Sequence, residues 1–198
     1  TVAPVQNRPR KVAYALKDEF LKKIEALEAQ GVIAKVETPT QWISSCLAVR
    51  KANGSVRVCI DPSDLNKAIR RNHFSLPTIE EVLPTLTNAK IFSLVDAKDG
   101  FLQVKLTDES SYLTTFWTPA GKYRWLRMPF GISSSPEEFQ RRLQQALEGL
   151  EGISTVADDI LIVGRGQTEA EARRDHDSNF IKLLQRAREQ NLNCTDPK

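Results

Sequence analysis

The spacing of apolar residues near the N-terminus changes from helical to extended. Between Leu16 and Leu27 apolar residues recur three and four positions apart, which predicts an amphipathic helix that Gly31 ends. The run Val32 to Val36 then predicts a short strand. Two further β-rich runs, 46–51 and 56–60, flank an Asn-Gly pair that favours a type I′ turn, so they predict a β-hairpin.

Capping boxes, in which a Ser or Thr is followed three residues later by Glu, predict the starts of three later helices. The boxes are Thr78–Glu81, Ser135–Glu138 and Thr168–Glu171. Apolar stripes follow the last two boxes, one made of Phe139, Leu143, Leu147 and Leu150, the other of Ala172, His176, Phe180, Leu183, Leu184 and Ala187. Strands are expected near 90–95, 112–117, 123–127, 153–157 and 160–163. Hairpins mixed with helices, without regular βαβ alternation, predict an α+β fold, an antiparallel sheet with helices packed on one face.

Composition narrows the class of protein. The chain has 198 residues, 40% hydrophobic and 27% charged, and no apolar run of about 18 residues that could span a bilayer. Its charge is uneven: residues 1–75 hold 13 Lys and Arg against 7 Asp and Glu, and residues 76–198 hold 15 against 18. The odd number of cysteines, Cys46, Cys59 and Cys194, favours free thiols in a reducing compartment. A basic N-terminal part is suited to an anionic polymer, although charge alone is weak evidence.

The sharpest chemical signal is an acidic pair at a predicted hairpin tip. Asp158 and Asp159 lie between two apolar, β-branched runs, and Asp96 ends a third such run. Each residue alone has an ordinary explanation, because Asp is common in turns and at helix starts. If the strands are neighbours, however, the three carboxylates converge, and each pair would repel by about 4 kcal/mol at 4 Å and an effective dielectric of 20. Divalent cations with oxygen ligands would relieve that repulsion and suit two-metal phosphoryl chemistry.

Ordered sequence motifs covering essentially the whole chain carry a family resemblance. They are 31–33 (GVI), 56–61 (VRVCID), 64–67 (DLNK), 76–79 (LPTI), 92–104 (FSLVDAKDGFLQV), 113–116 (LTTF), 127–132 (RMPFGI), 135–140 (SPEEFQ) and 158–161 (DDIL). Because these motifs occur in this order, the chain resembles the reverse transcriptase domain of gypsy-type long-terminal-repeat retrotransposons and related retroviral polyproteins.

The resemblance implies the fingers and palm of a right-hand polymerase. The fingers would cover roughly 12–75 and 104–132 and the palm roughly 76–103 and 133–198, with thumb, connection and RNase H absent. Asp96, Asp158 and Asp159 would be catalytic and, with the Ala97 carbonyl, would hold two Mg²⁺ ions, or Mn²⁺ as an alternative. The implied reaction is RNA-directed DNA synthesis, the transfer of a nucleotide from dNTP to a primer 3′-hydroxyl on an RNA or DNA template.

The same resemblance implies a nucleotide site. Lys51 and Arg57 on the fingers hairpin are expected to bind the triphosphate. For Lys51 an ordinary solvated charge is an equally good explanation, whereas the position of Arg57 just after Gly54-Ser55 favours the functional role. Phe101 is expected to exclude a ribose 2′-hydroxyl, Phe130 to line the pocket and Gln103 to contact the nucleotide. A core role for either aromatic residue stays open.

The sequence departs from the family pattern at two places. Val156 replaces the usual aromatic two positions before Asp158, and Pro62-Ser63 replaces a Tyr-Arg pair after the fingers hairpin, which removes one positive contact. Because the thumb is missing, the isolated fragment is expected to bind primer–template poorly and to be weakly active or inactive.

The resemblance also predicts the setting. The expected partners are template with primer, dNTP and the remaining polyprotein regions (thumb, RNase H, protease and integrase), without a membrane. The expected location is the cytoplasm, in a virus-like particle, with the nucleus as an alternative and no secretion. Two other functions remain open: a domesticated, inactive nucleic-acid-binding module, and an RNA-dependent RNA polymerase.

Overall fold

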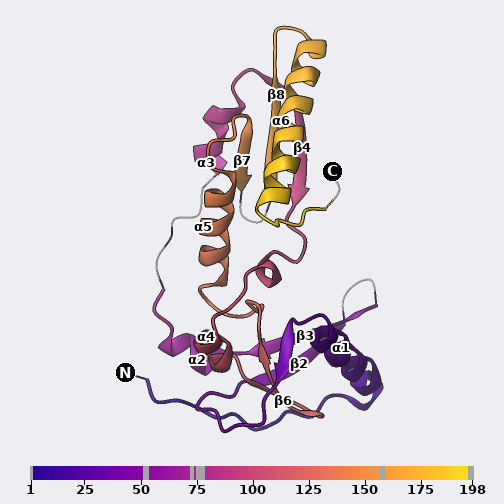
Figure 1. Cartoon of the computed structure of the whole chain (residues 1–198), viewed down its shortest axis with the longest axis vertical. Helices are drawn as coiled ribbons and strands as arrows, with labels where there is room; N and C mark the ends of the chain where they lie inside the picture. The colour runs from indigo at the N-terminus through magenta and orange to yellow at the C-terminus, as the bar shows by residue number, and fades with distance from the viewer. Residues whose placement is uncertain (1, 51–53, 72–73, 75–78, 157–158, 196–198) are drawn as a thin grey trace. The chain divides into compact units, whose positions relative to one another are not determined.

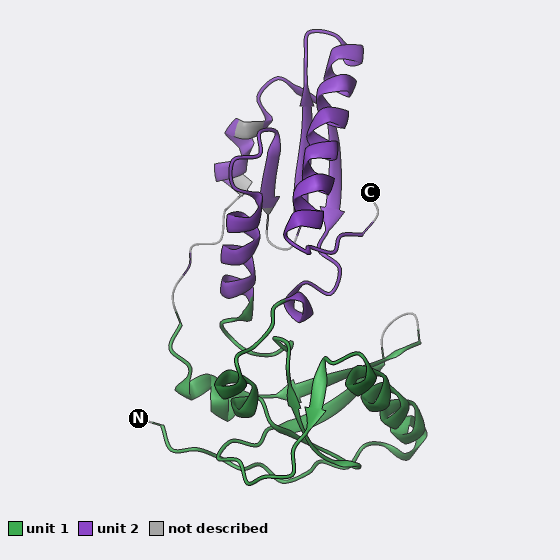
Figure 2. Ribbon diagram, in the orientation of Figure 1, with its two compact units in different colours: residues 1–71, 104–135 green, residues 72–103, 136–198 purple. Residues whose placement is uncertain are grey.

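The chain divides into two compact units (Figure 2). The computed structural model describes residues 2–50, 54–71, 74, 79–156 and 159–195. Unit 1 comprises 1–71 and 104–135, and unit 2 comprises 72–103 and 136–198. Two separate stretches of sequence therefore build each unit.

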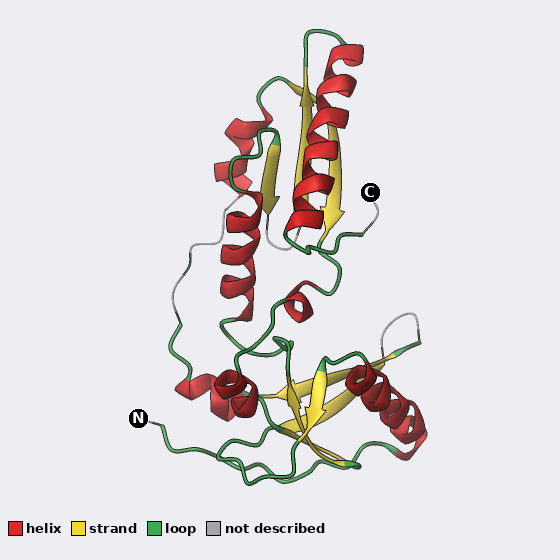
Figure 3. Ribbon diagram, viewed as in Figure 1, coloured by secondary structure: helices red, strands yellow, loops and turns green. Residues whose placement is uncertain are grey.

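Unit 1 combines short antiparallel sheets with one long helix (Figures 1 and 3). Its elements are η1 (Tyr14–Leu16), α1 (Lys17–Ala29), β1 (Ile33–Lys35), β2 (Ser45–Arg50), β3 (Val56–Asp61), α2 (Ser63–Ala68), α4 (Asp108–Leu113), β5 (Phe116–Thr118) and β6 (Gly121–Trp125). One sheet has the order β1-β6-β5, and β2 pairs with β3 in the second.

Helix α1 forms as the apolar spacing predicts. Phe20, Ile24 and Leu27 are buried, and the helix contacts β1 and β3. Gly31 adopts a φ of 66°, its N–H donates to the Glu28 carbonyl, and the Val32 N–H donates to the Leu27 carbonyl. These two bonds form a Schellman motif, which explains why the helix ends there.

The predicted hairpin is present as β2 and β3. Cys46 pairs with Ile60 and Arg50 with Val56 in an antiparallel register, while the connecting residues 51–53 lie outside the described part of the chain. Val56 and Val58 are buried, whereas Arg57 between them is exposed. The alternation presents Arg57 to solvent on the face that does not enter the core.

The strand expected near 112–117 is wrong at its start. Tyr112 and Leu113 belong to α4, and only Phe116–Thr118 is a strand. The hydroxyl oxygen of Thr107 accepts the Ser110 N–H and caps the helix. This N-cap signal outweighs the apolar run that follows it.

Unit 2 contains the longer elements. They are α3 (Ile79–Val82), η2 (Leu83–Leu86), β4 (Ala89–Asp96), η3 (Gly100–Gln103), α5 (Ser135–Leu147), β7 (Ile153–Val156), β8 (Asp159–Arg165) and α6 (Glu169–Glu189). The sheet order is β4-β8-β7, and both pairs are antiparallel. The α+β fold expected from the sequence is confirmed.

Helices cover one face of this sheet. Helix α6 lies along β4 and β8 (Figure 1), and the His176 Nε2 is 3.0 Å from the Ser93 hydroxyl. On the same face, the Gln140 amide of α5 donates to the Thr155 hydroxyl of β7 at 2.8 Å. Phe92 and Leu94, on the opposite face of β4, are 49% and 40% exposed. The sheet therefore has one buried and one open face.

The helix starts of unit 2 follow the sequence signals to different degrees. Thr168 and Glu171 form the predicted capping box of α6. Helix α5 begins at Ser135, whose hydroxyl donates to the Pro129 carbonyl. Thr78, the first residue of the remaining box, lies outside the described residues. In the α6 stripe, Leu184 is 41% exposed, so the core-facing side of that helix is narrower than predicted.

Among the residues that the structure describes, no helix is both long and apolar enough to cross a membrane. The three cysteines in this part of the chain are free thiols.

Candidate active site

Strand pairing brings two of the three predicted aspartates together. Asp96 is the last residue of β4, Asp159 is the first residue of β8, and the two are direct partners in the antiparallel register. Opposite residues share a face, with Cβ atoms about 4.5–5.5 Å apart. Asp158, the remaining aspartate, lies outside the described residues.

This pair lies on the open face of the sheet. Side chains alternate along β4, so Asp96 shares the face of Leu94 and not that of Ser93, which contacts α6. No side chain of the described residues forms a hydrogen bond or ion pair with either carboxylate. Within the described part of the chain, the two carboxylates thus share a face without a cationic side chain paired to either.

The donor set fits a hard divalent cation. Mg²⁺ binds oxygen ligands at about 2.1 Å, so two carboxylates at this spacing can share one ion. The carbonyl of Ala97, the predicted additional ligand, accepts the Gly100 N–H at 3.1 Å. A carbonyl oxygen has two lone pairs, which leaves one for a metal.

The turn after β4 is tightly packed. Asp99 has a φ of 50°, and a Cβ added to Gly100 would lie 2.8 Å from the Phe139 ring. Phe101 meets the same ring edge-to-face, with centroids 5.8 Å apart and an interplanar angle of 68°. Phe101 therefore packs on α5 while remaining partly exposed, so a core role and a sugar-selecting role are both compatible with its position.

Gln103, a predicted nucleotide contact, is held by main-chain atoms. Its amide nitrogen donates to the carbonyls of Lys98 at 2.7 Å and Asn193 at 2.8 Å. Its amide oxygen accepts the Asn193 N–H at 2.9 Å. The geometry gives this side chain a structural task that the sequence motif does not reveal.

Two predicted nucleotide residues meet within unit 1. The Arg57 guanidinium carbon lies 5.1 Å from the centroid of the Phe130 ring, a cation–π arrangement. Lys51, the other predicted triphosphate contact, lies outside the described residues.

Asn66 is a positioning residue that the sequence reasoning did not single out. Its side chain donates to the Gly131 carbonyl and accepts the Ser133 N–H, both at 2.9 Å. Gly131 has a φ of 104°, and a Cβ there would lie 3.2 Å from the Ile60 carbonyl oxygen. The loop next to Phe130 is thus bonded to α2 and lies close to β3. The only sequence signal for Asn66 was its position inside a family motif.

The two departures from the family pattern also have a place in the structure. Val156 pairs with Asp159 in the β7–β8 register. At the end of β3, Asp61 accepts from Ser63 and forms an ion pair with Arg10 at 2.9 Å. These contacts lower the pKa of Asp61, with the Ser63 hydrogen bond as the main cause.

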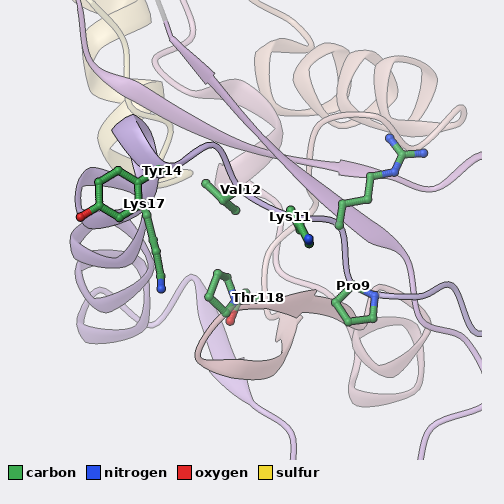
Figure 4. Close-up of a pocket in the computed structure, with 8 residues that line it drawn as sticks. Pro9, Lys11, Val12, Tyr14, Lys17 and Thr118 are labelled. Carbon is green, nitrogen blue, oxygen red and sulfur yellow. The ribbon is translucent and has the colours of Figure 1, made fainter.

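A separate hollow on unit 1 contains none of the predicted site residues (Figure 4). It has a volume of about 450 Å³ and is lined by Pro9, Arg10, Lys11, Val12, Tyr14, Lys17, Thr118 and Pro119. Tyr14 is 94% exposed, and Lys11 and Lys17 are also exposed. An exposed aromatic ring beside cations is a surface suited to nucleic acid.

Comparison with known sequences gives relatives in a nematode and in plant viruses. The K02A2.6 protein of Caenorhabditis elegans, described as uncharacterized, is 31% identical over 189 residues, covering 94% of the chain and 14% of that protein. The enzymatic polyprotein of figwort mosaic virus is 32% identical over 169 residues, covering 82% of the chain and 25% of the polyprotein. The chain therefore spans a minor part of these relatives.

Solved structures of foamy viral protease–reverse transcriptase have the same fold. One, in complex with double-stranded DNA, has a TM-score of 0.85 at 24% identity and covers 98% of the chain and 33% of its own. Another, in complex with an RNA/DNA hybrid, has a TM-score of 0.78 at 25% identity over 96% of the chain and 25% of its own. The expected right-hand polymerase fold is confirmed.

A sequence profile of one family, reverse transcriptase (RNA-dependent DNA polymerase), matches residues 49–198. That match covers most of the chain and includes Asp96, Asp158 and Asp159. The chain belongs to the reverse transcriptase family, as a domain of the kind found in retroelement polyproteins.

Proposed function

We propose that the chain contains the chemical centre of an RNA-directed DNA polymerase, with unit 1 as fingers and unit 2 as palm. The observation that carries the proposal is the register pairing of Asp96 with Asp159 on the open face of the sheet. In this proposal Asp158 completes the carboxylate set.

The chain's own residues would act mainly by positioning. Two bound Mg²⁺ ions would supply charge neutralisation and activation of the primer 3′-hydroxyl. Asp96, Asp158, Asp159 and the Ala97 carbonyl would hold these ions. Asp96 and Asp159 lie at the ends of two paired strands, which limits the motion of their carboxylates. Such preorganisation is the main contribution that a protein makes to phosphoryl transfer.

Arg57, Lys51 and Phe101 would contact the incoming nucleotide. Arg57, kept over Phe130 by the cation–π contact, would bind triphosphate oxygens together with Lys51. Phe101 would select against the ribose 2′-hydroxyl. These assignments rest on the family motifs and, for Arg57 and Phe130, on their mutual contact.

The template and primer would contact the basic unit. Unit 1 holds 17 Lys and Arg against 9 Asp and Glu, whereas unit 2 holds 11 against 16. The positive surplus on unit 1 is suited to a phosphate backbone, and the hollow beside Tyr14 offers cations and a ring for an unpaired strand. We also propose that the polyprotein acts in the cytoplasm within a virus-like particle, with the nucleus as an alternative site.

Single-nucleotide addition tests the proposal. Because adding one nucleotide does not require processive movement, the 198-residue chain at high concentration should extend a labelled primer on RNA or DNA templates by one residue when Mg²⁺ and the complementary dNTP are present. Chelation should stop the reaction, and rNTP should replace dNTP poorly. Absence of addition by the chain, also when it is fused to the thumb of a relative, would favour an inactive nucleic-acid-binding module, whereas preference for rNTP would indicate an RNA polymerase.

A further inference from the structure

Gln103 connects two segments that are distant in the sequence. Its amide donates to the Lys98 carbonyl, in the turn directly after Asp96, and to the Asn193 carbonyl in the segment after α6. The Asn193 N–H returns a third bond to the Gln103 amide oxygen. One side chain thus makes three hydrogen bonds of 2.7–2.9 Å to main-chain atoms on both sides.

These segments also hold the main chain at Asp96. The Thr195 N–H donates to the Asp96 carbonyl at 2.8 Å, and the Lys98 N–H donates to the Asn193 carbonyl at 2.9 Å. Ala97 and Cys194 form an antiparallel bridge between these two bonds. Residues 193–195 therefore pair with residues 96–98, and Gln103 closes the end of that pairing.

We propose that Gln103 is a positioning residue for the carboxylate site. By tying Lys98 to Asn193, it fixes the turn that carries Asp96 and the Ala97 carbonyl, so that both stay aligned opposite Asp159. The proposal rests on the proposed function, because it concerns the metal ligands of that same site. It replaces direct nucleotide contact as the role of Gln103.

An uncharged amide of this length is required for the arrangement. Two carbonyls need two N–H donors and one main-chain N–H needs an acceptor, and a glutamine side chain supplies all three. Gln103→Glu keeps the shape but loses both donors and places an anion against two carbonyl oxygens. Gln103→Met keeps the approximate volume and removes all three bonds. Gln145→Met is a matched control, because Gln145 is an exposed residue of α5 whose side chain accepts only a side-chain bond from Arg141 among the contacts described.

Mn²⁺ binding by the whole chain, followed through the paramagnetic resonance signal of the free ion, is the first measurement. We expect Gln103→Met and Gln103→Glu to raise the Mn²⁺ dissociation constant several-fold, and Gln145→Met to leave it unchanged. In single-nucleotide addition, the Gln103 variants should lower kcat and raise the half-saturating Mg²⁺ concentration, with an unaltered KM for dNTP. Thermal unfolding, recorded in parallel without metal, reports any general loss of stability.

A positioning role and a direct nucleotide contact of Gln103 predict different changes in metal affinity and in KM for dNTP. Unchanged Mn²⁺ affinity in both Gln103 variants, or a raised KM for dNTP with unchanged metal dependence, would overturn the positioning role. A wild-type chain that binds Mn²⁺ but adds no nucleotide would instead overturn the proposed function, and the Mn²⁺ comparison would still decide the role of Gln103.

Discussion

The pairing of Asp96 with Asp159 is expected to lower the stability of the fold. Like charges directly opposite each other in an antiparallel pair are destabilising, and no described side chain pairs with either carboxylate. The ion pairs of the described residues place opposite charges together instead: Lys67 meets Asp64 at 2.8 Å, and Arg124 meets Asp108 at 2.9 Å. A ligand-binding role therefore explains these two carboxylates at strand ends better than a contribution to stability does.

Replacing Asp96 with asparagine should separate its role in catalysis from its effect on stability. Loss of one ligand charge should cost about 4 kcal/mol of transition-state stabilisation, a fall of roughly a thousandfold in single-nucleotide addition. The free energy of unfolding should stay equal or rise, because a repulsion is removed. A near wild-type rate for Asp96→Asn, with Asp99→Asn as the control that should retain activity, would contradict the assignment.

Two variants can separate the packing of Phe101 on Phe139 from its proposed role in sugar selection. Phe101→Ala should lower the preference for dNTP over rNTP by about tenfold or more, because the steric barrier is removed. Phe139→Leu disturbs the same ring pair, worth about 0.5–1.5 kcal/mol, but leaves the Phe101 ring in place. It should reduce stability while preserving sugar selection. Equal loss of selection in both variants would mean that Phe101 acts through packing alone.

At the scale of elements, the start of α5 depends on a carboxylate. Glu138 accepts two bonds from Arg141, at 2.8 and 3.0 Å, and one from Arg142 at 2.6 Å. The Arg141 hydrogen bonds are the main cause that lowers the pKa of Glu138 below its usual 4.5. A lowered folded-state pKa means that this stabilisation is fully present above about pH 4.5 and is lost as the pH falls through the lower, folded value.

Thermal unfolding between neutral pH and pH 3 checks this linkage. Wild type should lose more stability on acidification below about pH 4.5 than Glu138→Gln does, because the variant has already lost the charged contact. Glu148→Gln, an exposed acidic residue of the same unit, should follow the wild-type curve. Parallel curves for wild type and Glu138→Gln would contradict the assignment.

Local signals predicted most elements because tertiary contacts agree with them. Helix α1 ends at Ala29, just before the expected stop residue Gly31, the β2–β3 hairpin has its expected strands, and α6 starts with its capping box. The expectation for 112–117 failed because an apolar run can belong to a helix or a strand, and the Thr107 cap starts a helix that includes Tyr112 and Leu113. Asn66 and Gln103 could not be recognised locally, since Gly131 and Ser133, which bond Asn66, and Asn193, which bonds Gln103, lie 65 to 90 residues away.

At the scale of the whole molecule, charge separates along the same lines as the fold. The N-terminal surplus of Lys and Arg seen in the sequence becomes a property of unit 1 once residues 104–135 join it. Which strands pair was not predictable from spacing, and the convergence of Asp96 with Asp159 depends on it. The family motifs supplied that information by resemblance, and the register now gives it a geometric basis.

Nucleic-acid binding should respond to charge on unit 1 but not on α6. Lys11→Glu or Lys17→Glu should weaken binding of a single-stranded oligonucleotide and reduce the slope of log K against log salt by about one. Lys182→Glu makes the same change at an exposed position of α6 and should have little effect. Equal weakening by all three variants would indicate a general charge effect instead of a binding surface.

The most direct measurement is anomalous diffraction from crystals of the chain grown with Mn²⁺, primer–template and a non-hydrolysable dNTP. The account predicts a manganese peak bound by carboxylate oxygens of both Asp96 and Asp159, within about 2.3 Å of each ligand atom, and loss of that peak in Asp96→Asn. A well-ordered ternary complex whose manganese ions do not contact Asp96 would contradict it.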